Sequence, residues 1–484
     1  MSQGSEVPEG WTVTSLNHLG KWSTGGTPSR KRKEFFGGDI PWIKSGDLTD
    51  GEVTSTEEKI SEEGLNNCSA KILPPGTISI ALYGATIGKL GTLAIEAATN
   101  QACANIQVNQ DIVNQKFLFH FLISQRSNFI EAGQGGAQPN LTNRIVRDWL
   151  ITLPPLAEQH RIVAAIEALF ARLGAANARL ERVPGILKQF RQSVLAAACD
   201  GRLTEDWWAE HEPSKKENYS EELISTDEQH RNNLHLTIPE DWSWTHIKSI
   251  GVVSGGLTKN SKREKFDLKL PYLRVANVYS NRLDLSEIKE IGVTKKEIDQ
   301  YLLQEGDLLV VEGNGSLDQI GRVARWDGSV SPCLHQNHLI KVRLNSNTTS
   351  RYILLWLLSP YGRELITKVS SSTSGLHTLS ISKVSSLPVS LPPLPEQQEI
   401  VRRVDALFAL ADKIEAEVAA AREKTETMRQ SILAQAFSGR LVPTEAELAR
   451  QEGREYEPAS VLLERIRSEK KEKKGRKGVQ STLV

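Results

Sequence analysis

The sequence predicts an α+β protein in which two strand-rich domains alternate with two long helices that pair as an antiparallel coiled coil. Two observations carry this prediction. A helical stretch with a coiled-coil period occurs twice, and each copy follows a stretch of short strands and turns. The 484 residues divide accordingly into a first domain (1–152), a first helical segment (153–204), a linker (205–237), a second domain (238–390), a second helical segment (391–444) and a polar tail (445–484).

Both copies of the helical segment open with the pattern LPPL-x-EQ. The first copy starts at Leu153 and the second at Leu391, so the offset is 391 − 153 = 238 residues. The offset holds without a gap to Leu203 and Leu441, where both copies end in GRL. Pro-Pro suits the start of a helix and the glycine of GRL suits its end, so each copy is predicted to be one long helix.

Apolar residues recur in each copy at alternating steps of four and three, a period of 3.5 that is typical of a coiled-coil seam. The predicted pairing positions are Ile162, Ile166, Leu169, Leu173, Leu180, Leu187, Ile400, Val404, Leu407, Ile414, Val418 and Ile432, and the seam also runs through Ala176 and Met428. The long connection through the second domain lets the chain return, which favours antiparallel pairing. Pro184 removes a helical hydrogen bond, but the seam keeps its phase there, so we expect a bend and not a break.

Two polar blocks of the repeat lie off the seam. They are the EQ pair, at Glu158-Gln159 and Glu396-Gln397, and an RQS triplet near the end of each copy. Because both blocks repeat without serving the seam, they are predicted to form a surface that meets another molecule.

The first domain reads as short strands separated by Gly and Pro, with a helix near 116–127 and a Gly-rich loop before Pro154. The second domain repeats this skeleton with different loops. VPEGW at Val7 corresponds to IPEDW at Ile238, and PWIKSGDL at Pro41 corresponds to PYLRVANV. Close helical copies beside diverged domains indicate one shared task for the helices and two related tasks for the domains.

Composition bounds the class of protein. The 59 basic and 59 acidic residues give no net charge, so any surface for nucleic acid must be local. Four cysteines are far apart without a C-x-x-C pair, which favours a reducing cytoplasm and excludes a disulfide framework. No apolar run predicts a membrane span, and the first residues lack the apolar core of a signal peptide.

A catalytic set is missing from the sequence. The stretch GATIGKL at Gly84 is one residue too short for a phosphate-binding loop and ends in Leu90 instead of Ser or Thr, so a turn between strands is expected. His335 and His338 are the nearest histidines, and in a strand they face opposite sides, so no metal is predicted. We therefore expect no cofactor, no metal and no catalytic residue.

Each domain carries a basic cluster after a Ser/Gly/Thr-rich turn, which favours contact with DNA phosphates. The clusters are Arg30, Lys31, Arg32 and Lys33 in the first domain, and Lys259, Lys262, Arg263 and Lys265 in the second. The candidate base readers are loop residues that can donate or accept two hydrogen bonds. They are Lys44, Gln134, Gln138, Arg274, Asn277, Asn314 and His377. The alternative for each is a turn residue that bonds its own backbone. The basic run near the C-terminus is predicted to be a solvated tail.

The doubled LPPL-x-EQ…ALF…RQS-x-LA…GRL pattern, alternating with two domains that open in PEGW and PEDW, resembles the DNA-specificity subunit of type I restriction-modification enzymes. The resemblance implies two target recognition domains, each of which reads half of a split, asymmetric sequence in double-stranded DNA. It also implies that the helices set the gap and dock two methyltransferase subunits. Motor-nuclease subunits complete the complex, and methylation and cleavage belong to these partners.

Two other interpretations stay open at the level of the residues. A self-sufficient methyltransferase or nuclease would need a cofactor loop and an acid–base set, which the sequence lacks. A coiled-coil adaptor without a DNA role would leave the matched basic clusters unexplained.

Overall fold

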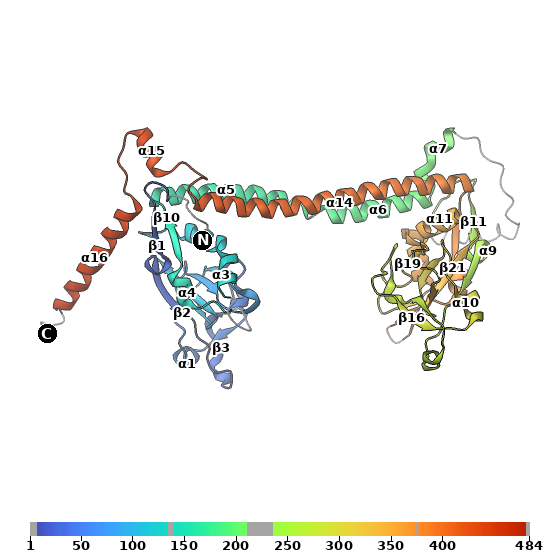
Figure 1. Cartoon of the computed structure of the whole chain (residues 1–484), viewed down its shortest axis with the longest axis horizontal. Coiled ribbons are helices and arrows are strands. Elements are labelled where there is room, and N and C mark those ends of the chain that lie inside the picture. The colour runs from blue at the N-terminus through green and yellow to red at the C-terminus, as the bar shows by residue number, and fades with distance from the viewer. Residues whose placement is uncertain (1–6, 134–139, 211–235, 374–375, 481–484) are drawn as a thin grey trace. The chain divides into compact units, whose positions relative to one another are not determined.

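In the computed structural model, the protein divides into two compact units, residues 1–180 with 420–484, and residues 181–419. The structure describes residues 7–133, 140–210, 236–373 and 376–480. Each unit joins a strand-rich domain to a pair of helices (Figure 1). One long helix, α14 (Leu394–Phe437), contributes its first part to the second unit and its last part to the first. The predicted fold class is confirmed.

The first domain is built on two small sheets with strand orders β2-β9-β6-β7-β4 and β5-β3-β8. Its elements are β1 (Thr12–Ser15), β2 (Gly20–Thr24), β3 (Phe36–Ile43), β4 (Gly51–Val53), β5 (Lys59–Ile60), α1 (Glu62–Asn66), β6 (Ile78–Ala81), β7 (Leu90–Leu93), β8 (Ala98–Thr99), β9 (Cys103–Val108), α2 (Gln115–Ser124), α3 (Arg126–Ala132), α4 (Asn143–Asp148) and β10 (Leu150–Leu153). Alternate residues of the larger sheet point to opposite faces. Ile78 and Ile80 pack with Phe117 and Leu118 of α2, whereas Ala81 packs into a separate cluster on the other side.

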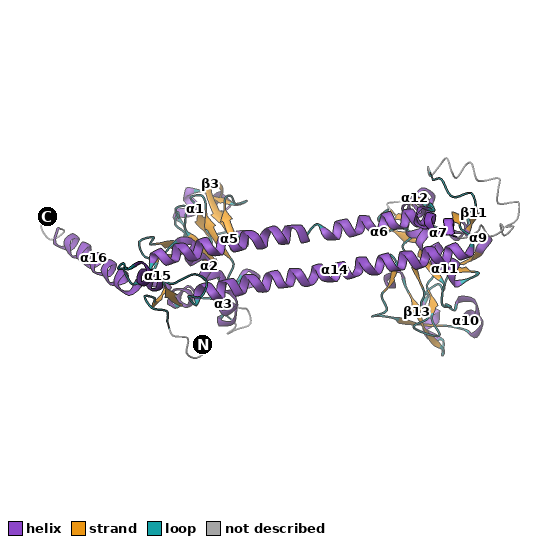
Figure 2. Ribbon diagram, turned by 90° about the horizontal axis from the view of Figure 1, so that it is seen from above, coloured by secondary structure: helices purple, strands orange, loops and turns teal. Residues whose placement is uncertain are grey.

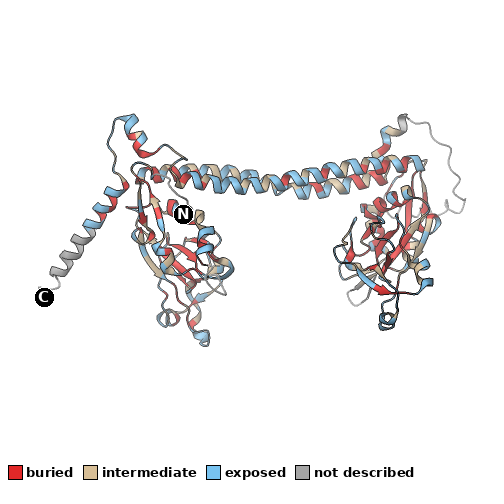
Figure 3. Ribbon diagram, in the orientation of Figure 1, coloured by how far each residue is buried: buried red, intermediate tan, exposed pale blue. Residues whose placement is uncertain are grey.

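The second domain repeats this plan, with main sheets of order β12-β21-β17-β19 and β16-β13-β20. Its elements are β11 (Ser243–His246), α9 (Ile247–Ile250), β12 (Gly251–Ser254), β13 (Lys269–Leu273), β14 (Val278–Tyr279), β15 (Arg282–Leu283), β16 (Lys289–Gly292), α10 (Lys295–Tyr301), β17 (Leu308–Val311), β18 (Gly313–Asn314), β19 (Val323–Arg325), β20 (Leu334–His335), β21 (Leu339–Leu344), α11 (Asn347–Leu358), α12 (Pro360–Val369), β22 (Ser371–Thr373), β23 (Leu376–Thr378), α13 (Ile381–Ser385) and β24 (Pro388–Leu391). Both domains keep their buried residues inside the strand-rich body (Figure 3).

Each domain begins and ends in one antiparallel ribbon. β1 pairs with β10 from Thr12↔Leu153 to Ser15↔Leu150, and β11 pairs with β24 from Ser243↔Leu391 onward. The last strand of each ribbon leads through Pro-Pro into a long helix, α5 (Leu156–Leu180) or α14. Chain entry and exit therefore lie side by side at the base of each domain.

A buried Trp–Glu hydrogen bond ties each domain to its helix. Trp11 Nε1 donates to Glu158 Oε1 over 2.9 Å, and Trp242 Nε1 donates to Glu396 Oε2 over 2.7 Å. Both carboxylates are fully buried, and burial raises the pKa of the Glu158 carboxyl. The prediction that the EQ pairs form an outer surface is wrong, because their side chains satisfy buried groups at the join between domain and helix.

The glycine of each GRL closes the same join. Gly201 and Gly439 adopt positive φ angles of 87° and 73°. A Cβ at Gly201 would lie 2.3 Å from the Pro239 ring, and a Cβ at Gly439 would lie 2.7 Å from the Pro8 ring. Glycine is required at both places by the backbone and by the close approach of proline.

The helices pair antiparallel in both units (Figure 2). In the first unit, the Arg429 guanidinium lies 4.7 Å from the Phe170 ring, while Arg422 donates to the carbonyl of Leu180, so a later residue of α5 meets an earlier residue of α14. In the second unit, α6 (Val183–Cys199) runs along α14, and Arg191 binds Asp412 over 2.6 Å. Further along that chain, the Leu203 carbonyl accepts from Arg403 over 2.9 Å, which gives the same direction.

The predicted seam positions differ in burial. The buried ones are Ile162, Ile166, Leu187, Ile400, Val404 and Val418, and the half-buried ones are Leu169, Leu173, Leu180, Leu407, Ile414 and Ile432. Ala176 and Met428, by contrast, are exposed. Ile162, Ile166, Ile400 and Val404 are buried in cores that the helices share with a domain, whereas Leu187 and Val418 are buried outside those cores.

The expected bend at Pro184 is a break. Helix α5 ends at Leu180 and α6 begins at Val183. Proline has no N–H to donate to the carbonyl four residues earlier, which is that of Leu180. Arg422 Nη2 donates to this carbonyl over 3.1 Å instead. A side chain of α14 therefore satisfies the backbone acceptor that the proline leaves open.

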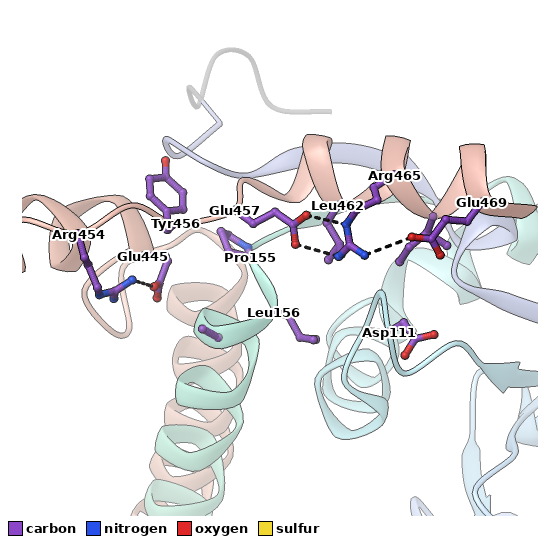
Figure 4. A pocket seen from close by; sticks show the side chains of 12 residues that line it. Asp111, Pro155, Leu156, Glu445, Arg454, Tyr456, Glu457, Leu462, Arg465 and Glu469 are labelled. Carbon is purple, nitrogen blue, oxygen red and sulfur yellow. Dashed lines mark hydrogen bonds and ion pairs between the residues drawn. The ribbon is translucent and has the colours of Figure 1, made fainter.

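The C-terminal residues, expected to be a polar tail, pack on the first unit as α15 (Glu445–Glu452) and α16 (Ala459–Gln480). Leu462, Leu463 and Ile466 are buried in its core. A groove of about 470 Å³ lies between this segment and the LPPL step, and Arg454 and Arg465 at its rim bind Glu445, Glu457 and Glu469 (Figure 4). The apolar spacing within α16, which composition hid, explains its docking.

Candidate nucleic-acid interface

The first basic cluster contains two kinds of cation. Arg30 stacks 4.8 Å from the Phe36 ring and binds Glu58 over 3.0 Å, so it is tethered to the domain. Lys31 and Lys33 are exposed and have no ion pair within the described residues. Arg32 lies 5.4 Å from the ring of Phe35 but is otherwise exposed. The cluster therefore presents free positive charge on a fixed loop, as phosphate contact requires.

In the second cluster, the structure separates Arg263 from the lysines. Lys259, Lys262 and Lys265 are exposed. Arg263 is 11% exposed, binds Glu297 over 2.8 Å and donates to the Gly292 carbonyl over 3.0 Å. The hydrogen bond from Arg263 lowers the pKa of the Glu297 carboxyl. Arg263 thus holds its loop in place and is not available to DNA in this structure, contrary to expectation.

Lys44 and Arg274 occupy matched places, each before a 3-10 turn that follows a strand. The Lys44 N–H donates to Asp47 over 2.8 Å, and the Arg274 N–H donates to Asn277 over 2.9 Å. The Lys44 ammonium binds Glu58 over 2.7 Å, and this hydrogen bond lowers the pKa of the Glu58 carboxyl. Asn277 is buried and its amide also donates to two backbone carbonyls. The prediction that Asn277 reads a base is therefore wrong, because the turn uses all of its polar groups.

Two candidate base readers meet in the second domain. Asn314 and His377 are direct partners in the β18–β23 ladder, on segments 63 residues apart by 377 − 314. The first domain has an isolated bridge between Tyr83 and Asn140, which corresponds to the neighbouring pair Gly313 and Thr378 of this ladder, and Tyr83 is exposed. Gln134 and Gln138 lie outside the described residues. Residues that are distant in the sequence are thus paired at this place in both domains.

Sequence reasoning missed a second matched cation. Ala81 N–H donates to the Lys89 carbonyl over 2.9 Å, and Val311 N–H donates to the Arg322 carbonyl over 2.8 Å. Lys89 and Arg322 therefore hold the same place in the two domains. The signal was present in the alignment of the two sheets, where Gly88-Lys89 falls on Gly321-Arg322. The stretch at Gly84 is a 3-10 turn between β6 and β7, as expected.

Exchanging Lys31 and Lys33 for alanine should weaken DNA binding to all sequences alike. Each lost phosphate contact should lower the slope of log affinity against log salt by about 0.9. Thermal stability should stay unchanged, since neither side chain binds another described residue. The measurement is a salt titration of duplex binding by the full chain. The matched control is Lys71→Ala, which removes an exposed lysine outside the predicted basic clusters. An unchanged slope in the double variant would contradict the assignment.

The second domain contains a buried histidine that makes its stability depend on pH. Burial lowers the pKa of His335 from 6.5 to about 4, and its Nδ1 donates to the Tyr301 carbonyl over 3.1 Å. Among the described residues, no group of three possible metal ligands occurs. Because its pKa is about 4, His335 stays neutral in the folded chain at neutral pH.

Because the unfolded chain binds the proton first, the folded state should lose stability as pH falls from 6.5, and the loss should be complete below about 4. The full effect is on the order of 3 kcal/mol. His335→Gln keeps a donor for Tyr301 and should remove this part of the pH dependence. Urea unfolding of both proteins across this range measures the difference, and equal pH profiles would refute the prediction.

Comparison with known proteins agrees with this arrangement. Residues 8–184 and 239–420 match the family described as type I restriction modification DNA specificity domain. The specificity subunit of the type I restriction enzyme EcoKI from Escherichia coli K12 is 30% identical over 497 residues, covering 99% of each chain. The EcoBI specificity subunit from Escherichia coli is 33% identical over 79% of this chain and 77% of its own.

Two solved structures show the same fold. One comes from a study of the assembly and conformational transition of a type I restriction-modification system, with a TM-score of 0.63 and 19% identity over 90% of this chain and 100% of that one. The other is the HsdS subunit from Thermoanaerobacter tengcongensis, with a TM-score of 0.53 and 18% identity over 90% of this chain and 98% of that one. Among the described residues, no helix combines the length and apolar character that a bilayer span needs. The chain belongs to the type I restriction-modification specificity family and is the DNA specificity subunit of such a complex.

Proposed function

We propose that residues 1–152 and 238–390 are separate target recognition domains, each of which reads one half of a bipartite, asymmetric sequence in double-stranded DNA. The observation that carries this proposal is the repeated join at the base of each domain. Each domain is closed by its own ribbon and is tied by its own Trp–Glu bond, from Trp11 to Glu158 and from Trp242 to Glu396. Such a body can vary its loops without disturbing the helix that carries it.

The loops support two different half-sites. At the bridge position the second domain holds Gly313 and Thr378, next to Asn314 and His377, whereas the first domain holds Tyr83 and Asn140. Amide and imidazole groups bond base edges in the major groove, and a phenol ring offers a different surface. The exposed lysines of the basic clusters supply affinity that does not depend on sequence.

The paired helices then act as the ruler and as the platform for partners. Helix residues 153–204 and 391–444 set the gap between the half-sites and dock two DNA methyltransferase subunits, to which motor-nuclease subunits are added. The exposed RQS triplet supports the docking role, since Gln192, Ser193, Arg429, Gln430 and Ser431 are exposed in the structure. The subunit itself contributes recognition, and adenine methylation and cleavage belong to its partners.

Mapping methylated adenines in cells that carry this chain and its methyltransferase tests the proposal. The expected result is one motif with two unlike specified halves, separated by a gap of fixed length without base preference. A single uninterrupted motif, or two identical halves, would contradict it.

A further inference from the structure

Two arginines of the second domain differ from all others there. Six of its eight arginines are neutralised by a carboxylate or bound to backbone carbonyls, for example Arg325 with Glu305 over 3.2 Å and Arg363 with the Ile320 carbonyl over 2.7 Å. Arg282 and Arg322 have neither kind of partner within the described part of the chain. They are therefore the uncompensated guanidinium groups of this domain.

One tyrosine holds both of them. The guanidinium carbons of Arg282 and Arg322 lie 4.8 and 5.5 Å from the centre of the Tyr279 ring. Tyr279 is 39% exposed and Arg282 is exposed, whereas Arg322 is half-buried and its Nε is buried without a hydrogen-bond partner in the described structure. Stacking on a ring fixes the direction of a guanidinium and leaves its donors free. Two like charges beside one ring also repel each other, which an anion between their donors would relieve.

The backbone keeps this arrangement rigid. Asn281, with a φ of 55°, makes the turn between β14 and β15, and its N–H donates to the Val323 carbonyl over 2.9 Å. This bond places the hairpin of Tyr279 and Arg282 beside Arg322. The Arg322 carbonyl in turn accepts from Val311, three residues before Asn314. The Arg322 backbone is thus bonded to β17, the strand that leads to the candidate base reader Asn314.

The first domain has half of this arrangement. Asp50 makes the corresponding turn with a φ of 66°, and its N–H donates to the Leu90 carbonyl over 2.8 Å. Lys89 stands where Arg322 does and is exposed. Gly51 follows the turn where Arg282 does, so this position has no cation, and Arg126, which binds the Gly88 carbonyl at the turn, is neutralised by Asp50. One basic position is therefore common to both domains, and the stacked pair is particular to the second.

We propose that Arg282 and Arg322, positioned by Tyr279, form a clamp for a DNA backbone phosphate, with Lys89 as its single-charge counterpart in the first domain. The proposal rests on DNA reading by the second domain as set out above. A guanidinium offers two parallel donors to phosphate oxygens, so two of them held against one ring bring several donors to one place on the DNA backbone. Their role is to set the register of the duplex beside the base-reading loops.

Salt titration of duplex binding tests the clamp, with the full chain and its mapped target. Arg282→Ala and Arg322→Ala should each lower affinity roughly tenfold. In the double variant, the slope of log affinity against log salt should fall by ~0.9 for each phosphate contact that is lost, and one or two contacts should be lost. The mapped target sequence should stay the same. A double variant with the wild-type slope, or one with a changed target at wild-type slope, would overturn the proposal.

Matched variants separate the clamp from mere packing. Arg325→Ala removes a charge three residues after Arg322, at the end of β19, that Glu305 already neutralises, so it should leave the slope unchanged. Tyr279→Phe keeps the ring and should keep binding, whereas Tyr279→Ala should weaken it. Equal slopes for Arg322→Ala and Arg325→Ala would count against the clamp. If scrambling the second half-site left wild-type affinity unchanged, half-site reading would fail while the slope still reported on the clamp.

Discussion

Replacing Glu396 by alanine is expected to lower the unfolding free energy of the second unit by about 3 kcal/mol. The carboxylate is fully buried and accepts from Trp242 Nε1 over 2.7 Å and from Thr204 Oγ1 over 2.6 Å. Alanine would leave the Trp242 indole N–H buried without an acceptor, and the Thr204 hydroxyl with only the Gly201 carbonyl at 3.4 Å. Glu158→Ala should act alike in the first unit, where Trp11 and the Glu445 N–H lose their acceptor.

Glutamine is the matched control at both positions. It keeps one acceptor oxygen and removes a charge whose burial is unfavourable, as the raised pKa of Glu158 shows. Glu158→Gln and Glu396→Gln should therefore lose less stability than the alanine variants. Urea unfolding followed by tryptophan fluorescence measures the effect. Alanine variants as stable as the wild type would refute the view that these bonds hold the domains on their helices.

A charge in the buried core between α14 and the second domain should also lower the unfolding free energy strongly. Val404→Asp buries a carboxylate at a fully buried position, next to Ile400 in the core that α6 and α14 share with the second domain. The expected loss is about 4 kcal/mol or more, which suffices to unfold a unit of ordinary stability. Limited proteolysis should then cut α14 in the variant and leave it intact in the wild type.

Ala409→Asp controls for the charge and for helix propensity, because Ala409 is an exposed position of the same helix. It should change stability by no more than about 0.5 kcal/mol. If both aspartate variants behaved alike, the packing of α14 against α6 would not be what stabilises the second unit.

The fold was predictable because periodicity is a long-range signal. The 3.5-residue seam and its repetition predict both helices, and the long connection through the second domain favours their antiparallel pairing. At Pro184 the unbroken seam predicts a bend. The helix instead breaks between Leu180 and Val183, because proline has no N–H for the Leu180 carbonyl. The function of the EQ pair was missed for another reason. Glutamate and glutamine usually lie at the surface. Only the structure shows that a tryptophan indole donates to a buried glutamate where each domain meets its helix.

The candidate interface was predictable only in part. Basic loops are visible in a sequence, but whether a cation is free depends on acids distant along the chain. Arg263 is neutralised by Glu297, and the Asn277 side chain is fully hydrogen-bonded to backbone groups around its own turn. Arg282 and Arg322 carried no motif, and their common ring appears only when two hairpins meet. The docking of α16 was likewise hidden, because three apolar residues were diluted by charge.

Exchange of the first domain tests the central claim, that each domain reads its half-site alone. Residues from Thr12 to Leu153 would be replaced by the matching domain of a relative. That domain must supply its own β1 and β10 strands, and Trp11 and Glu158 stay unchanged. Methylated adenines would then be mapped in cells that carry the hybrid and its methyltransferase. The account predicts that one half of the motif changes while the other half and the gap stay the same. A change in both halves, or in the gap, would contradict it.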